Sequence, residues 1–398
     1  MRLSYCTNVH PAEDLDGVIA QLRSCAGPVR RRLGVDRLGV GLWLPAALAV
    51  RLDTEPGTLA ALRAVLEEQG LVVTTLNAFP YTAFHAPVVK HAVYLPRWGE
   101  ADRTAHTLSC ARVLAALLPP GGEGSVSTLP LGWREPWTDE DDEAATAALV
   151  HVGRELRRLA RSTGRTVRLA IEPEPGCVLD SVEDTVAWLS ARTGDPDAGG
   201  IDAEHVGLCL DTCHLATSFA DPAGAVRAVR AAGLRVFKLQ ASAALELPDP
   251  RDEAGRAALA AYAEPRYLHQ VRARGGDGVV AVDDLSDVDA VGALPTSGPW
   301  RVHVHMPLHL APRAPLRSTT EVLLAAATEL GTELEGIDVD VETYTWSVLP
   351  GEVPSRTQLV SGIASEVGWA RTRLGRIAGA APETPPTGVP VTTSAAVR

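Results

Sequence analysis

The sequence has no excess of positive charge: its 398 residues include 37 lysines and arginines against 49 aspartates and glutamates, a formal net charge of -12. Nucleic acids and anionic membranes call for basic patches, so this balance argues against both as partners. No apolar run is long enough to cross a bilayer, and Met1 leads directly into a strand-like segment without a signal-peptide pattern. We therefore expect a cytoplasmic protein that does not span a membrane.

The cysteines are few and show neither zinc-finger nor Cys-x-x-Cys spacing, so we expect reduced, mostly buried thiols. Apolar residues, in contrast, make up 46% of the chain, enough for a sizeable core. The length fits one large barrel with insertions as well as it fits two domains. We predict one domain over residues 1–379, and a disordered tail over 380–398, which is rich in Pro, Thr, Ala and Val and has no periodicity.

The most informative stretch runs from residue 205 to residue 214. Its apolar residues alternate with a second face that ends in Asp211, which is typical of a buried strand with a carboxylate at its C-terminal end. His214 follows three residues later, so the strand end and the next turn can present an acid and an imidazole to the same point. Such a pair suits a divalent metal. The alternative is an aspartate that caps the next helix and a histidine on the surface.

Three further segments alternate in the same way, and each carries polar side chains on one face. These are 167–172 with Glu172, 300–306 with Arg301, His303 and His305, and 337–342 with Asp338, Asp340 and Glu342. Strands of this kind, each followed by a helical segment, favour a parallel barrel whose polar strand ends converge at one rim. We therefore predict an α/β fold, a (β/α)8 TIM barrel.

The strand count exceeds the barrel by one. Alternation predicts nine strands, at 3–8, 36–45, 72–77, 124–130, 167–172, 206–211, 235–240, 300–306 and 337–342. One of them therefore belongs to an insertion or lies outside the ring, and we place the insertion near 243–310. Within and after it we expect a helix over 254–273 and a capping box at 318–321.

Aromatic side chains are concentrated in the loops at the predicted rim. The loop 78–99 alone carries five of the 18 aromatic residues, so it is a candidate lid or substrate wall, or else a self-packed surface loop. We expect the wall to be formed by rim aromatics from several loops, namely Trp43, Phe79, Tyr81, Trp133, Trp137 and Trp346. His10 and His85 are better explained as hydrogen-bonded loop histidines than as ligands.

The segments around Glu172, Asp211 and Glu342 together resemble the xylose isomerase-like TIM-barrel superfamily, which includes sugar phosphate isomerases/epimerases and endonuclease IV. More narrowly, the segments 5–10, 76–81, 127–130 and 342–350 resemble the EboE family of metabolite traffic proteins. The resemblance covers most of residues 3–375.

The superfamily resemblance implies a divalent metal held by Glu172, Asp211 and Glu342, with a histidine from a strand between the last two. Mn²⁺ or Zn²⁺ is expected first, then Mg²⁺ or Co²⁺. The sequence departs from this pattern, because the corresponding strand reads Lys238-Leu-Gln240. The missing ligand could come from the pair His303 and His305, or from the amide oxygen of Gln240.

The chemistry that the resemblance implies is proton abstraction next to the carbonyl of a sugar or sugar phosphate. Glu172 and Glu342 would act as base and acid, His214 would orient an oxygen, and Lys238 would offset phosphate or enediolate charge. Alternatively, the two glutamates are structural and pair with Arg168 or Arg301.

Two other functions follow from the same resemblances. The EboE resemblance implies a non-catalytic carrier that binds a metabolite, such as a sugar phosphate or an aromatic precursor, during its export alongside a membrane prenyltransferase. The endonuclease IV resemblance implies an abasic-site nuclease. The acidic balance, and aromatic loops without interleaved Lys or Arg, oppose the nuclease.

Overall fold

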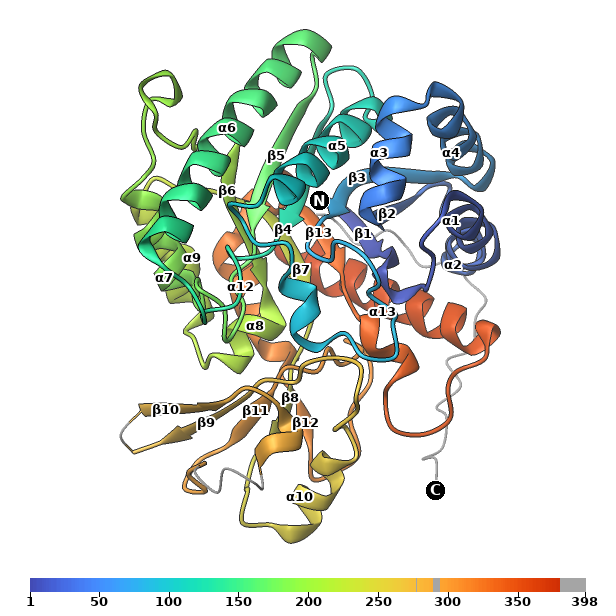
Figure 1. Cartoon of the computed structure of the whole chain (residues 1–398). Helices are drawn as coiled ribbons and strands as arrows, with labels where there is room; N and C mark the ends of the chain where they lie inside the picture. The colour runs from blue at the N-terminus through green and yellow to red at the C-terminus, as the bar shows by residue number, and fades with distance from the viewer. Residues whose placement is uncertain (277, 289–293, 380–398) are drawn as a thin grey trace.

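The computed structural model describes residues 1–276, 278–288 and 294–379. Within these residues, eight parallel strands close into a barrel with helices around it (Figure 1). In spatial order the strands are β1 (Arg2–Cys6), β13 (Asp338–Val341), β7 (Val236–Ala241), β6 (Val206–Asp211), β5 (Thr166–Ile171), β4 (Glu123–Thr128), β3 (Leu71–Asn77) and β2 (Leu38–Trp43). The predicted TIM barrel is confirmed. The predicted tail, 380–398, lies outside the described residues.

Side-chain alternation determines which face of each strand meets the helices. In β6 every residue is buried, and the apolar residues Val206, Leu208 and Leu210 join the main core beneath the helices. Cys209, from the other face, packs with Ala170 and Phe237 in a separate cluster. Asp211 shares the face of Cys209 and ends the strand, so its carboxylate is presented at the barrel mouth.

The helices begin where capping residues predict. Thr138, Ser181 and Ser355 each form a reciprocal capping box with the residue three positions later, and the first two confirm predicted starts. The helices outside the insertion are α1 (Leu15–Gln21), α2 (Gly27–Leu33), α3 (Ala46–Thr54), α4 (Pro56–Gln69), α5 (Ala101–Leu117), α6 (Asp139–Thr163), α7 (Val182–Ser190), α8 (Thr212–Thr217), α9 (Pro222–Ala231), α12 (Thr320–Leu330) and α13 (Arg356–Ile377). A π-helical turn, Leu22–Ala26, joins α1 to α2.

The predicted insertion is a second sheet between β7 and α12, in yellow and orange in Figure 1. Its order is β10 (Gly278–Val282), β9 (Val271–Gly275), β11 (Trp300–Val302), β8 (Leu245–Leu247) and β12 (Arg317–Ser318), all antiparallel, and it also contains α10 (Glu253–Ala260). Segment 300–306 is therefore not a barrel strand. Its alternation buries Trp300 and Val302 in the insertion's own apolar cluster instead.

Two further predictions in this region are wrong. The helix expected over 254–273 ends at Ala260. Pro265 cannot donate a helical N–H. After it the chain turns, and the Glu264 carboxylate accepts from the backbone N–H groups of Arg266 and Tyr267, both at 2.7 Å. The capping box at 318–321 does not form. The hydroxyl of Thr319, the N-cap of α12, accepts from the Ala244 backbone N–H at 2.8 Å instead.

The loop 78–99 and the insertion meet over the barrel mouth. The backbone N–H groups of Val89 and Lys90 donate to the Arg266 carbonyl at 2.7 and 2.9 Å. The six cysteines are buried free thiols, as expected. No helix within the described residues is long and apolar enough to cross a membrane.

Candidate active site

Three acidic side chains meet at the barrel mouth. Glu172 directly follows β5, Asp211 ends β6 and Glu342 directly follows β13, and one oxygen from each lies within 4.8 Å of the other two. All three are buried, with exposed fractions of 3%, 2% and 4%. The alternative pairing with arginines is not formed, because Arg168 binds Glu123 and Arg301 binds Glu246.

Neutral donors hold these three carboxylates. Oε1 of Glu342 accepts from the amides of Asn8 and Asn77 at 2.7 and 2.9 Å. The Gln240 amide nitrogen donates to both oxygens of Glu172 at 3.1 Å. Oδ1 of Asp211 accepts from the Ser242 hydroxyl at 2.6 Å and from two backbone N–H groups. Within the described part of the chain, no lysine or arginine forms an ion pair with any of the three.

The pKa values of the three carboxyl groups are shifted by burial and by the charges of neighbouring groups. Burial raises the pKa of Glu172 to about 7. Burial, with the nearby charges of Glu172 and Asp211, holds the pKa of Glu342 well above its usual value. For Asp211, burial acts in the same direction, but His214, His305 and the hydrogen bond from Ser242 outweigh it and lower the pKa.

Three oxygen atoms at the site have no donor. Oδ2 of Asp211, Oε1 of Gln240 and Oδ1 of Asn8 are buried and accept no hydrogen bond from the described residues. A buried polar atom left in this state costs about 1–3 kcal/mol. Carboxylate and amide oxygens are also ligands for hard divalent cations. The residues present therefore fit a divalent metal, with the oxygen of Gln240 at the position where the resemblance implies a histidine.

Three histidines flank the carboxylates. His303 and His305 follow β11 in the insertion, and they reach the barrel mouth beside His214, at the start of α8. The Nε2 atom of His303 lies 3.1 Å from Nε2 of His214 and 3.1 Å from Nε2 of His305. Nε2 of His305 is 3.9 Å from the free oxygen of Asp211. The histidine pair thus reaches the predicted place although its strand is outside the ring.

The structure does not bring Lys238 to this site. Lys238 lies two residues before Gln240 on the same face of β7, so its side chain is one layer deeper in the barrel. It is fully buried, its Nζ lies 3.1 Å from Oδ2 of Asp340, and it donates to the Ser127 hydroxyl at 3.2 Å. Lys238 is not among the residues that line the mouth cavity. The predicted contact with phosphate or enediolate is therefore corrected to an internal ion pair.

The cavity at the mouth has an acidic side and an aromatic side. Its aromatic lining consists of Phe79, Phe84, Tyr94, Tyr267 and Tyr344. Of the six rim aromatics that the sequence indicated, Phe79 is the one found in this lining. Trp43, for example, is buried against Phe84 and donates to the Pro80 carbonyl at 3.0 Å.

Two polar residues near the histidines were not predicted. Glu174 is 5% exposed and accepts from the Tyr94 hydroxyl at 2.7 Å and from the Gln270 amide at 3.2 Å. Its position, two residues after Glu172 at a strand end, is the signal that could have identified it. Gln270 had no such signal, because it lies just before β9 in the segment predicted as a helix. His10 and His85 are hydrogen-bonded loop histidines, to the Tyr5 hydroxyl at 3.2 Å and the Asn8 carbonyl at 2.7 Å.

Comparison with known proteins shows the family of the chain. The family model described as xylose isomerase-like TIM barrel matches residues 31–281. The chain belongs to this family. The matched region contains Glu172 and Asp211, whereas the two insertion histidines and Glu342 lie beyond it in this xylose isomerase-like barrel. No curated protein matches the chain.

Solved structures agree with the family at the level of the fold. D-psicose 3-epimerase from Clostridium cellulolyticum H10, solved with D-tagatose, is 12% identical, with 94% of this chain and 99% of that chain covered and a TM-score of 0.50. A xylose isomerase-like TIM-barrel protein from Mycobacterium smegmatis, in complex with magnesium, is 14% identical, with 95% and 97% covered and a TM-score of 0.50. At such identities the likeness of these proteins to this xylose isomerase-like chain is one of fold alone.

Proposed function

We propose that this protein is a metal-dependent isomerase or epimerase that moves a proton at the carbon next to the carbonyl of a small sugar. The observation that carries the proposal is the group of three buried carboxylates, Glu172, Asp211 and Glu342, which no lysine or arginine of the described residues neutralises. The D-tagatose and the magnesium in the two similar structures support this class of ligand and cofactor.

Glu172, Asp211 and Glu342 would hold the divalent ion, with the free oxygen of Gln240 or Nε2 of His305 as a further ligand. Mn²⁺ or Zn²⁺ is the proposed ion. When bound, it would polarise the substrate's carbonyl and hydroxyl oxygens and so acidify the neighbouring carbon. The chain's own groups then have to position the substrate and move the proton.

Glu172 and Glu342 are the proposed proton-transfer groups. They come from β5 and β13, which β6 and β7 separate in the ring, so they reach the cavity from different sides. Amide donors, from Gln240 and from Asn8 and Asn77, fix the orientation of each carboxylate. His214 is a positioning group. Its Nδ1 donates to the Pro173 carbonyl at 2.8 Å, which leaves Nε2 on the cavity side.

The lining favours an unphosphorylated substrate. Among the described lining residues the one lysine or arginine is Lys90, and its ammonium is already bound by Asp284 at 2.5 Å and by the Glu264 carbonyl at 3.2 Å. A phosphate would therefore find no free cation to bind. The aromatic rings suit the apolar face of a sugar ring. The same lack of free cations counts against an abasic-site nuclease.

Hydrogen exchange in heavy water tests the proposal. We expect the metal-loaded protein to introduce deuterium next to the carbonyl of at least one ketose, and to leave the matching ketose phosphates unlabelled. Exchange needs only abstraction and return of a proton, so it reveals slow turnover. Glu342→Gln should abolish it. Glu352→Gln, which changes an exposed glutamate, is the matched control.

Metal content has to be measured in the same samples, because loss of a ligand also weakens metal binding. Absence of exchange with every ketose in a broad panel, in protein that retains its metal, would overturn the proposed reaction.

The aromatic side of the cavity favours a second candidate, a non-catalytic metabolite carrier of the EboE type. Five aromatic rings, with Val89 and Leu268, would accept an aromatic or apolar precursor. Calorimetric binding of such a metabolite by protein that exchanges no ketose would support this candidate. Its implied partner, a membrane prenyltransferase, would have to co-purify with the chain.

A further inference from the structure

We propose that the cavity at the barrel mouth selects sugars that carry a protonated amino group, and that Glu174 is the counter-ion of that group. The inference rests on the proposed function for the sugar itself, and it adds the substituent that the lining recognises. It concerns binding, so its test does not require the chain to convert any sugar.

Glu174 is a buried carboxylate outside the group proposed to bind metal. It is 5% exposed and lines the cavity. Glu172, Asp211 and Glu342 form one group of mutually close oxygens, and Glu174 is not part of that group. A divalent ion bound by those three would therefore leave Glu174 without a directly bound cation. A buried carboxylate in this position needs another partner.

The permanent cations of the protein do not supply that partner. In the part of the chain that the structure describes, no lysine or arginine forms an ion pair with Glu174. Lys90 is the one lysine or arginine in the described lining, and its ammonium is bound by Asp284. Glu174 is therefore open to a cationic ligand that enters the cavity.

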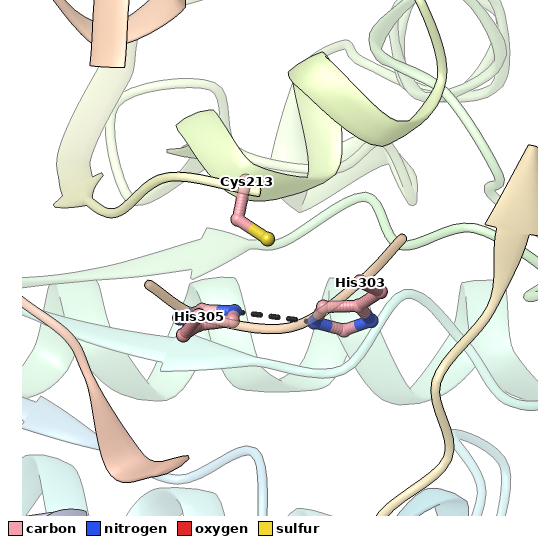
Figure 2. A group of neighbouring side chains, drawn as sticks. All are labelled: Cys213, His303 and His305. Carbon is pink, nitrogen blue, oxygen red and sulfur yellow. Dashed lines mark hydrogen bonds between the residues drawn. The ribbon is translucent and has the colours of Figure 1, made fainter. Parts of the chain in front are cut away.

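A histidine lies near Glu174 but directs its ring nitrogens elsewhere. Nδ1 of His303 is 3.5 Å from Oε1 of Glu174. The Gln270 amide nitrogen faces two acceptors, Oε1 of Glu174 and the Pro175 carbonyl. The Gln270 oxygen therefore faces His303 and accepts from its Nδ1 at 2.6 Å. Figure 2 shows the other ring nitrogen of His303 directed toward His305. His303 thus donates no hydrogen bond to Glu174.

Two neutral donors hold one oxygen of Glu174 and leave the other free. Oε1 accepts from the Tyr94 hydroxyl at 2.7 Å and from the Gln270 amide at 3.2 Å. Oε2 accepts no hydrogen bond from the described residues and, unlike Oδ2 of Asp211, it is not sealed off by protein atoms. Tyr94 comes from the loop 78–99 and Gln270 from the insertion. The carboxylate is therefore fixed from two sides, with Oε2 open to the cavity.

Three aromatic rings of the same lining favour a positive charge as well. The ring centroids of Phe84 and Tyr267 are 5.1 Å apart, and that of Tyr344 lies 5.3 and 4.8 Å from them. The face of an aromatic ring attracts a cation within about 6 Å of its centroid. A carboxylate and aromatic rings in one cavity therefore suit a protonated amine, whose N–H can also donate to Oε2 of Glu174.

Calorimetry with the metal-loaded wild-type chain tests the preference. The probes are 1-amino-1-deoxy-D-fructose and 1-amino-1-deoxy-D-tagatose, each compared with its parent ketose and its N-acetyl derivative. Acetylation keeps an N–H but removes the charge. We expect each amino ketose to bind at least about tenfold more tightly than its neutral forms, because charged hydrogen bonds are the stronger ones. Equal or weaker binding of both amino ketoses would overturn the proposal.

Glu174→Gln assigns the preference to this carboxylate, because glutamine keeps the size of the side chain and an oxygen for Tyr94 but removes the charge. The preference for the amino ketose should disappear. Glu183→Gln, at an exposed glutamate, is the matched control and should keep it. Metal content is measured in each sample, since an amine can also bind a metal ion directly. An undiminished preference in Glu174→Gln would refute the role of Glu174.

The result is separable from that of the proposed function. Deuterium exchange reports proton abstraction, whereas calorimetry reports binding. A chain that exchanges no ketose but prefers the amino ketoses would refute the proposed reaction and support the ammonium site. A chain that exchanges ketoses without this preference would refute the ammonium site alone.

Discussion

Asp338, Asp340 and Glu342 leave β13 on the same face and are almost equally buried, yet among the described residues only the first two have a lysine or arginine partner. Asp338 binds the Arg2 guanidinium at 2.6 Å. Asp340 binds Lys238 at 3.1 Å and accepts from the Ser4 hydroxyl at 2.6 Å. Glu342 lies nearer the mouth, and its side chain accepts from the amides of Asn8 and Asn77.

We call Asp338 and Asp340, with their partners Arg2 and Lys238, the inner layer, and we call Glu172, Asp211 and Glu342 the outer layer. The two layers differ in whether their carboxylates still need a cation. The inner layer neutralises its own charges, so it stabilises the barrel without an added ion. The outer layer leaves buried carboxylates uncompensated, and such groups either keep a proton or take a cation from solution. One repeated strand pattern thus produces an internal ion-pair layer and a layer suited to metal binding.

The largest effect should come from breaking the inner layer. Lys238→Met leaves Asp340 buried without its cation, and removing one partner of a buried pair typically costs about 3–5 kcal/mol. Urea unfolding should show this loss, and adding Asp340→Asn should recover much of it. Arg235→Met is the control, because Arg235 pairs with Glu204 at an exposed site. A loss in Lys238→Met no larger than in that control would mean that the two layers do not differ as argued.

The next effect concerns the outer layer. Mn²⁺ or Zn²⁺ at 100 times its dissociation constant should raise the free energy of unfolding by about 2.7 kcal/mol, and a chelator should reverse the gain. In Asp211→Asn most of the gain should disappear, because a ligand is lost. Asp249→Asn, at an exposed position, should respond like the wild type. Thermal shift measures each case, and an undiminished shift in Asp211→Asn would contradict the assignment.

Glu366 sharpens the comparison, because it is a buried carboxyl that has no lysine or arginine partner among the described residues and can keep its proton. Burial raises its pKa to about 7, although it accepts from the Thr343 hydroxyl at 2.6 Å and the Leu308 N–H at 2.9 Å. Between pH 4.5 and 7 the folded chain therefore holds a proton that the unfolded chain has lost, so stability falls as pH rises through this window. Glu366→Gln should remove that loss.

The expected gain in Glu366→Gln is about 3 kcal/mol at pH 8 and close to zero at pH 4.5. Urea unfolding at both values measures it. A gain of equal size at both pH values would show that packing, and not the proton, is responsible.

The smallest effect is expected outside the layers. Deleting residues 380–398 should change neither the melting temperature, by more than about 2 °C, nor metal binding, because this segment has no periodicity and little apolar surface to dock. A drop of several degrees would show that the segment packs on the barrel.

The carboxylate positions could be predicted because alternation and strand ends are local signals. Glu172, Asp211 and Glu342 each follow the same short pattern, and a parallel barrel brings such strand ends together. Alternation does not report which sheet a strand joins. The sequence therefore leaves open which of the nine strands lies outside the ring, and the structure shows that it is the strand before His303.

The aromatic side of the cavity could not be predicted for a related reason. Tyr267 and Gln270 act at the mouth only because the insertion folds back over it, and their segment has helical spacing without forming a helix. Trp43 and Trp133 are residues of the type that forms a binding wall, but packing buries Trp43, and neither residue lines the mouth cavity. Long-range packing, which no short sequence window contains, makes this choice.

The pairing of the first strand with the last has a consequence for synthesis. The side chain of Arg2 binds that of Asp338, 336 positions later, and within the described residues the other strand that pairs with β1 is β2. While the chain is being translated, β1 therefore keeps an open edge until β13 emerges from the ribosome. A polypeptide released before that point would lack both the closed ring and Glu342, so a prematurely terminated product would lose its fold and its ion-binding carboxylate together.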